Sequence, residues 1–317
     1  MRAAVVTAPG ATPAAGTFAE PEAGPGVQLV EIVAAGIHPV VRGLASGRHY
    51  GSTDTWPKIP GVDAVARTAD GGLCYTGFTA DPYGTFAERA AVRLVLPVPS
   101  GADPVTLAAG MNPGMASWLP LTAYLDVPAE ASVLVLGATG SAGRLAVQNC
   151  RALGVKRVLA AGRNPDALAR TAELGGCATV SLAGETVAGG ALGDAVAEYQ
   201  PDLVLDFLWG PVAEAALTAL GTRGLATVVH PVNYVEIGAA AGATAAVPAA
   251  VLRSRSVTLR GSGAGSVAHD ALARAATGYA ELLASGTVQV DAVAYPLDDI
   301  ATAWADTNSE HRAVLVF

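Results

Sequence analysis

The sequence is poor in charged residues, in aromatic residues and in cysteine. Of its 317 residues, 15% are charged, 5% are aromatic and three are cysteines. No apolar run reaches the roughly 18 residues that a membrane-spanning helix needs. The net charge is −8, which argues against nucleic acid and anionic membranes as binding partners. We therefore expect that the protein binds neither nucleic acid nor a membrane. We expect its substrate to be a small molecule.

The three cysteines, Cys74, Cys150 and Cys177, form no C-x-x-C pair and show no metal-ligand spacing. An odd and sparse count is typical of a reducing compartment, in which the thiols are structural. The first residues, Met1–Val6, lack the apolar core of a secretory signal and favour a strand instead. These features predict a soluble, cytoplasmic enzyme.

A glycine-rich turn organises the middle of the chain. The apolar run Val133–Leu136 leads into Gly137–Gly143, which is followed by a helical pattern and a second apolar run at Val158–Ala161. This order predicts a β–turn–α–β unit that binds the pyrophosphate of a dinucleotide at the helix N-terminus. The turn is not a strict G-x-G-x-x-G, so its strand–helix context carries the interpretation. The expected cofactor-binding residues here are Thr139, Gly140, Ser141, Ala142 and Gly143.

The end of the second strand of this unit indicates which cofactor is bound. An NAD-binding unit usually has an acidic residue there, to accept a hydrogen bond from the ribose 2′-hydroxyl. This chain has Arg163 and Asn164 instead. The guanidinium of Arg163 can pair with a 2′-phosphate, and Asn164 can add donors, cap the next helix, or do both. We therefore predict NADPH as the cofactor.

Three later loops are expected to close around the cofactor, because ligands bind beyond the carboxyl ends of parallel strands. Core packing is the alternative role for the aromatic residues of the first loop. The candidates are Phe207, Leu208 and Trp209 in the first loop, Gly238 in the loop Gly238–Gly242, and Gly261, Ser262 and Gly263 in the last.

Apolar runs separated by Gly and Pro predict strands in the first hundred residues, and strands alternate with helices from residue 131 onward. The first part has expected strands at Arg2–Thr7, Val27–Ala34, Val62–Ala66 and Ala87–Leu96, a short helix at Val40–Ser46 and helical segments over 104–127. The second part has expected strands at 133–136, 157–161, 178–181, 203–207, Tyr234–Ile237 and Val257–Leu259, and helices at 142–153, 165–174, 191–199, 211–220 and Val267–Ala284. The tail has an expected strand at Val288–Val290, a turn at Pro296–Asp299, a short helix and a strand at Ala313–Phe317. This alternation predicts a doubly wound parallel sheet.

Five short motifs occur in a characteristic order: Ala34–Val40 (AAGIHPV), Ser46–Tyr50 (SGRHY), Ile59–Asp63 (IPGVD), Gly84–Glu88 (GTFAE) and Gly137–Gly143 (GATGSAG). Each motif is weak alone, but the ordered set is specific. Over essentially the whole chain the sequence resembles the medium-chain dehydrogenase/reductase superfamily, and in particular its zinc-free, quinone-oxidoreductase-like branch.

The resemblance implies an α/β fold, with a Rossmann-type doubly wound parallel sheet and a GroES-like β-barrel catalytic domain. The implied catalytic domain comprises residues 1–117 and 287–317, and the NADPH-binding domain comprises residues 118–286. The resemblance also implies an active site in the interdomain cleft. It implies a homodimer joined through edge strands of the cofactor domain, here Val257–Arg260.

Zinc is not expected, although alcohol dehydrogenases of this superfamily use it. Their cysteine ligand would fall near His38, and their His-Glu pair would fall on Val62 and Asp63. Valine cannot ligate a metal, and His38 with Asp63 gives two ligands, too few for a tetrahedral site. The prediction is therefore a zinc-independent enzyme with no metal site.

Without a metal as Lewis acid, the acceptor must be electron-poor or must meet a positioned acid. Tyr50 matches a tyrosine that many zinc-free relatives place in the substrate cleft, and a structural role at a turn is its alternative. His38 stands where quinone reductases often carry asparagine. It can donate a proton near neutral pH, or it can be a structural histidine under the cofactor. The sequence thus predicts an NADPH-dependent reductase of quinone- or enone-type double bonds, with Tyr50 and His38 as catalytic residues. An imine (C=N) reductase and a non-catalytic NADPH-binding protein are the alternatives.

Overall fold

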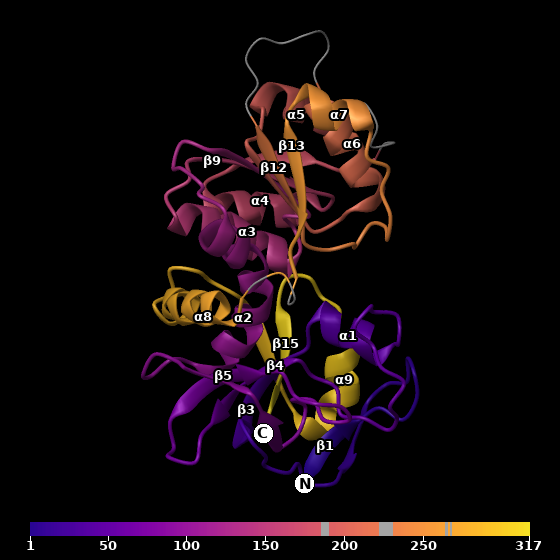
Figure 1. Cartoon of the computed structure of the whole chain (residues 1–317), viewed down its shortest axis with the longest axis vertical. Helices are drawn as coiled ribbons and strands as arrows, with labels where there is room; N and C mark the ends of the chain where they lie inside the picture. The colour runs from indigo at the N-terminus through magenta and orange to yellow at the C-terminus, as the bar shows by residue number, and fades with distance from the viewer. Residues whose placement is uncertain (185–189, 222–230, 264–265, 267) are drawn as a thin grey trace. The chain divides into compact units, whose positions relative to one another are not determined.

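The computed structural model describes residues 1–184, 190–221, 231–263, 266 and 268–317 (Figure 1). The chain forms two compact units. Unit 1 comprises Met1–Pro113 and Ala276–Phe317, and unit 2 comprises Gly114–Ala275. The mixed α/β fold with one parallel and one mostly antiparallel sheet confirms the predicted fold class. Within the described residues, no helix is long and apolar enough to cross a membrane.

Unit 2 contains a six-stranded sheet in which every pairing is parallel, in the order β10-β9-β8-β11-β12-β13. The order reverses between β8 and β11, which is the switch point where α/β sheets bind ligands. The strands are β8 (Ser132–Leu136), β9 (Arg157–Gly162), β10 (Ala178–Ser181), β11 (Leu203–Asp206), β12 (Val232–Glu236) and β13 (Val257–Gly261). The helices are α3 (Ser141–Ala152), α4 (Pro165–Gly175), α5 (Ala191–Tyr199), α6 (Gly210–Leu220) and α7 (Ala249–Ser254).

Helices cover both faces of this sheet, and the alternation of side chains along β8 shows why its sequence is apolar throughout. Val133 and Val135 pack in one core cluster with residues of α3 and α4. Leu134 and Leu136 pack in the other cluster with residues of α5, α6 and α7. A strand buried on both faces needs an unbroken apolar run, and this is the signal that the sequence carries.

Unit 1 contains a seven-stranded sheet in the order β14-β15-β3-β4-β5-β7, with β6 paired to β3. Its strands are β3 (Gln28–Gly36), β4 (Asp63–Arg67), β5 (Leu73–Gly77), β6 (Arg89–Val92), β7 (Leu94–Pro97), β14 (Ala292–Pro296) and β15 (Arg312–Val316), and β1 (Arg2–Val5) pairs with β2 (Ala14–Thr17). Its helices are α1 (Pro39–Ala45) and α9 (Ile300–Ala305), with a 3₁₀ turn at Leu297–Asp299. The chain passes from one unit to the other within two helices, α2 (Pro104–Leu119) and α8 (His269–Ala284). A π-helical turn at Pro120–Tyr124 follows α2.

Several predicted strands of unit 1 were wrong in detail. The run Ala87–Leu96 is two strands, because β6 pairs with β3 whereas β7 pairs with β5. The strand expected at Val288–Val290 lies instead at Ala292–Pro296, where it pairs with β15. Val288 is buried without joining a strand, so burial rather than strand pairing explains its apolar character. Strands β2 and β5 were not predicted. The predicted helix start at Val267 lies outside the described residues.

Candidate functional site

The glycine-rich turn joins β8 to α3, as the sequence predicts. Gly137 has a φ of +89°, a conformation that favours glycine. A Cβ on Gly143 would lie 2.2 Å from the carbonyl oxygen of Gly137, so only glycine lets the helix approach the turn this closely. A Cβ on Gly140 would meet only the Gly137 oxygen, at 3.6 Å. The turn therefore combines tight packing at Gly143 with open space at Gly140.

The N-terminus of α3 has donors to offer a phosphate group. Gly140 is the N-cap residue and supplies no side-chain cap, so the N–H groups of the first turn, Ser141 to Gly143, have no partner within the helix. The Oγ atom of Ser141 is buried and has no hydrogen-bond partner among the described residues. An unpartnered hydroxyl beside free N–H groups at a helix N-terminus fits an anionic group. The residues present therefore fit a dinucleotide pyrophosphate.

Arg163 and Asn164 follow β9, and the structure separates their roles. The Oδ1 atom of Asn164 accepts hydrogen bonds from the N–H groups of Asp166 and Ala167, both at 3.0 Å, so Asn164 caps α4. Its role toward the cofactor stays a prediction. The side chain of Arg163 is exposed. An exposed guanidinium at the end of the second strand fits the 2′-phosphate of NADPH.

The loop after β11 packs against the glycine-rich turn. A Cβ on Gly137 would lie 3.0 Å from Cδ2 of Leu208, and one on Gly238 would lie 3.2 Å from the carbonyl oxygen of Phe207. Trp209 has a φ of +53°, which is unusual for a bulky residue. The structure therefore brings Phe207, Leu208 and Gly238 together beside the glycine-rich turn, whereas the ring of Trp209 packs against Tyr234.

The third predicted loop is tied to β12. The N–H of Ser262 donates a hydrogen bond to the carbonyl oxygen of Glu236 at 2.8 Å, and the N–H of Gly263 donates to the Oγ atom of Ser266 at 2.9 Å. Gly261 is the last residue of β13, and no atom would lie within 4 Å of a Cβ there. Contact of Gly261, Ser262 and Gly263 with the cofactor stays a prediction.

His38 lies in unit 1, in a buried polar cluster. Its side chain is 1% exposed, and its Nε2 atom lies 3.5 Å from the Oδ1 atom of Asp63. This is an ion-pair distance, and neither ring nitrogen makes a hydrogen bond with the described residues. A Cβ on Gly36 would lie 2.4 Å from the His38 Nε2 atom, so glycine there makes room for the ring.

Two residues that sequence reasoning missed hold Asp63 in place. The hydroxyl of Tyr75 donates to Oδ2 at 3.0 Å, and the Nδ2 group of Asn112 donates to Oδ1 at 3.2 Å. Burial and the neighbouring carboxylate raise the pKa of Tyr75 well above its usual value, so this hydroxyl stays protonated. Asp63, Tyr75 and Asn112 are far apart in the sequence, so no local motif reveals the cluster.

Tyr50 lies on the turn after α1 and is 89% exposed. Its ring is tilted by 32° against the ring of His49, with the centroids 4.1 Å apart. The imidazole of His49 in turn accepts a hydrogen bond from the N–H of Gly51 at 3.1 Å. The turn thus presents an exposed phenol, and the catalytic role of Tyr50 stays a prediction.

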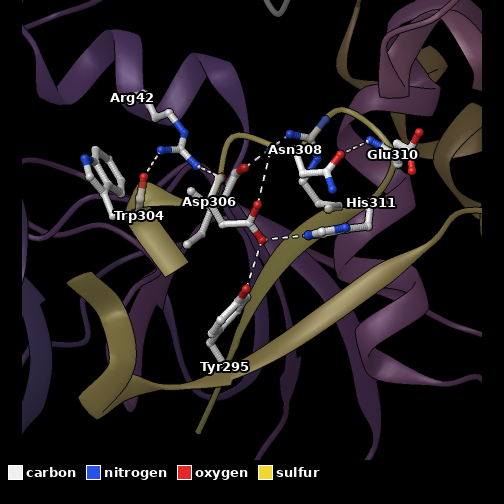
Figure 2. A network of polar contacts seen from close by, with 9 residues as sticks. Arg42, Tyr295, Trp304, Asp306, Asn308, Glu310 and His311 are labelled. Carbon is white, nitrogen blue, oxygen red and sulfur yellow. Dashed lines mark hydrogen bonds and ion pairs between the residues drawn. The ribbon is translucent and has the colours of Figure 1, made fainter. Parts of the chain in front are cut away.

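A second polar cluster of unit 1 ties α1 to the end of the chain (Figure 2). The Oδ2 atom of Asp306 accepts hydrogen bonds from the Tyr295 hydroxyl at 2.9 Å and from the Nε2 atom of His311 at 2.6 Å. Arg42 of α1 donates to the carbonyl oxygens of Trp304 and Asp306. The hydrogen bond from His311 lowers the pKa of Asp306. We assign this cluster a stabilising role.

No family model matches the sequence, but relatives and solved structures do. A protein described as a "Probable NADPH-dependent quinone reductase" of Emericella nidulans is 30% identical over 227 residues, which are 68% of this chain. The match spans 62% of that relative's length.

Several solved structures match the whole chain. The quinone oxidoreductase of Thermus thermophilus, solved alone and with NADPH, is 26% identical with a TM-score of 0.79, and the match covers 100% of both chains. A mycobacterial protein complexed with NADPH is 20% identical with a TM-score of 0.82, also over 100% of both chains, and supports the fold. The family predicted from the motifs is confirmed: the chain belongs to the medium-chain dehydrogenase/reductase superfamily, in its quinone-oxidoreductase-like branch.

Proposed function

We propose that this protein is an NADPH-dependent, zinc-independent reductase, which transfers a hydride to an electron-poor double bond of quinone or enone type. The observation that carries the proposal is the open N-terminus of α3, where the buried Ser141 hydroxyl lacks a partner among the described residues. The quinone reductases among the relatives support the choice of acceptor. The proposal of zinc independence follows from the residue types, because Val62 cannot ligate a metal.

The chain's own residues would bind both phosphate-bearing parts of the cofactor, the pyrophosphate and the 2′-phosphate. The N–H groups of the first turn of α3 donate to the pyrophosphate, together with the Ser141 hydroxyl. Arg163 pairs with the 2′-phosphate through its planar fork. NADPH supplies a hydride when it is bound, and one proton completes the reduction.

His38 is the residue that we assign as the proton donor. A quinone that takes up a hydride becomes a hydroquinone anion, and one further proton on its oxygen gives the neutral hydroquinone. The buried carboxylate of Asp63 lies 3.5 Å from Nε2, a distance at which it can pair with the ring. The exposed hydroxyl of Tyr50 donates a hydrogen bond to the carbonyl of the acceptor. That the reaction takes place in a cleft between the two domains stays a prediction, which the family resemblance implies.

An imine reductase is the second candidate, because the same imidazolium can protonate the nitrogen of a reduced C=N bond. The test is to follow NADPH oxidation against a panel of quinones, enones, enoyl thioesters and cyclic imines. We expect turnover with quinones or enones. Turnover with imines alone would favour the second candidate, and tight NADPH binding without any turnover would favour a non-catalytic binding protein.

A homodimer joined through β13 is part of this proposal. Strand β13 ends the order of the parallel sheet, and Leu259 on it is 39% exposed. An exposed edge strand is a template for pairing with another chain. Sedimentation of the protein should give the mass of a dimer, and Leu259→Lys should shift it toward the monomer. A cytoplasmic location also remains a proposal.

A further inference from the structure

Asp206, the last residue of β11, is a buried acidic residue that the proposed chemistry does not use. Its side chain is 0% exposed. Oδ1 accepts hydrogen bonds from the N–H groups of Leu208 at 2.8 Å and Trp209 at 3.0 Å. Oδ2 accepts one from the Tyr234 hydroxyl at 2.6 Å. The carboxylate therefore fixes the first residues of the loop that follows its own strand.

The main chain of Asp206 fixes the neighbouring loop as well. Its carbonyl oxygen accepts hydrogen bonds from the N–H groups of Ile237 at 2.7 Å and Gly238 at 3.1 Å. The loops are also joined directly, because the N–H of Ala241 donates to the carbonyl oxygen of Leu208 at 2.7 Å. One residue thus sets the start of both loops at the carboxyl end of β11 and β12.

The geometry that Asp206 maintains is not one that the loop would adopt without support. Trp209 has a φ of +53°, and the ring of Tyr234 packs edge-on against its indole with centroids 6.3 Å apart. Leu208 reaches the glycine-rich turn, where a Cβ on Gly137 would lie 3.0 Å from its Cδ2 atom. The hydrogen bonds of Asp206 therefore hold a strained loop against the turn that binds the pyrophosphate.

We propose that Asp206 is a positioning residue, which holds the loop over 207–210 and the start of the next loop in the arrangement that the dinucleotide requires. The inference rests on the proposed function, because it takes NADPH as the ligand of unit 2. The pKa of Asp206 is raised, because the effect of burial is larger than the opposing effect of the hydrogen bonds from Tyr234 and the two N–H groups. A carboxylate kept here despite the cost of burying it suits a role in positioning.

The test compares Asp206→Ala with Asp206→Asn. Alanine removes all three side-chain hydrogen bonds, whereas asparagine keeps an acceptor oxygen for the two N–H groups and an NH₂ group that can donate to the Tyr234 oxygen. We expect the Kd for NADPH to rise about tenfold or more in Asp206→Ala and to stay within about threefold of wild type in Asp206→Asn. Hydrogen exchange at the amides of Leu208 and Trp209 in the free protein should accelerate by a similar factor in Asp206→Ala but not in Asp206→Asn.

Ser132→Ala is the matched control. Ser132 is a buried polar residue at the opposite end of the same sheet, and its Oγ donates to the carbonyl oxygen of Tyr199 at 3.3 Å. We expect it to lower the melting temperature without changing the Kd or the exchange of the two amides. If Asp206→Ala behaves like this control, the carboxylate is merely structural and the inference is wrong.

Tyr234→Phe covers the case in which Asp206→Ala does not fold. It removes one of the three hydrogen bonds, and we expect a Kd about threefold higher together with faster exchange at Leu208 and Trp209. Unchanged values of both would overturn the inference. If the wild-type protein does not bind NADPH, the proposed function fails, and amide exchange in the free protein still decides whether Asp206 holds the loop.

Discussion

The Nε2 atom of His38 lies 3.5 Å from the Oδ1 atom of Asp63, and both side chains are buried. The carboxylate is held by Tyr75 and Asn112, whereas the imidazole makes no hydrogen bond with the described residues. The carboxylate is therefore held in place, whereas the two ring nitrogens of His38 have no partner among the described residues.

His38→Gln tests the assignment of the proton donor. Glutamine has a similar size and hydrogen-bonding capacity but cannot carry the proton, so we expect kcat with a quinone to fall about 100-fold with little change in the Kd for NADPH. His311→Gln is the control, because His311 is also a histidine of unit 1 that lies beside an aspartate, with Nε2 2.6 Å from Asp306, and it takes no part in the proposed chemistry. Equal kcat values for the two variants would remove His38 from the mechanism.

Tyr50→Phe tests the exposed phenol. Because the side chain is 89% exposed, the variant should fold with an unchanged melting temperature. We expect kcat/KM for the acceptor to fall about tenfold, through the loss of one hydrogen bond to its carbonyl. Unchanged steady-state kinetics would show that Tyr50 is simply a turn residue that stacks on His49.

The cofactor turn was predictable from the sequence because its signal is local. Glycines at 137, 140 and 143 follow a strand that is buried on both faces, and the structure gives each a distinct environment. The Asp63 cluster was not predictable in this way. It depends on the register of β4 and β5, which pairs Val65 with Tyr75 and thereby sets Tyr75 diagonally across from Asp63 on the same face.

Asp206 carries a sequence signal that was overlooked. An acidic residue that ends an apolar run such as Leu203–Leu205 is either exposed beyond the strand or buried with several partners. The hydrogen bonds to Leu208, Trp209 and Tyr234 show that the second case applies. The shift of the predicted strand at Val288–Val290 has a different cause, since an apolar alternation reports burial and not strand pairing.

Two glycine variants separate packing from binding in the turn. Gly143→Ala places a Cβ 2.2 Å from a backbone oxygen, and we expect the free energy of unfolding to fall by about 1–3 kcal/mol. Gly140→Ala meets only one atom, at 3.6 Å, so its stability should change by less than about 1 kcal/mol while the added methyl group weakens NADPH binding. Denaturant unfolding and NADPH titration of both variants provide the check. Equal stability of the two variants would contradict the close approach of α3 to Gly137.

The Asp306 cluster predicts a dependence of stability on pH. The hydrogen bond from His311 lowers the pKa of Asp306, so the folded protein favours the carboxylate. This contribution is fully present above the pKa of an unfolded aspartic acid, about 4, and is lost as the pH falls through the lower pKa of the folded state. Asp306→Asn should therefore lower the melting temperature at pH 7 and reduce its fall between about pH 5 and pH 3. Parallel curves for the variant and the wild type would contradict this.

The central claim is that the protein is an NADPH-dependent reductase, and its most direct test is the ratio of kcat/KM for NADPH to kcat/KM for NADH with a quinone as acceptor. Arg163 follows β9 with an exposed side chain, where an NAD-binding unit usually has an acidic residue. We predict a wild-type ratio of at least about 100, corresponding to the pairing of an arginine with a phosphate, and a ratio near about 1 for Arg163→Ala, with the value for NADH unchanged. A wild-type ratio near one, or an equal loss with both cofactors in Arg163→Ala, would contradict the account.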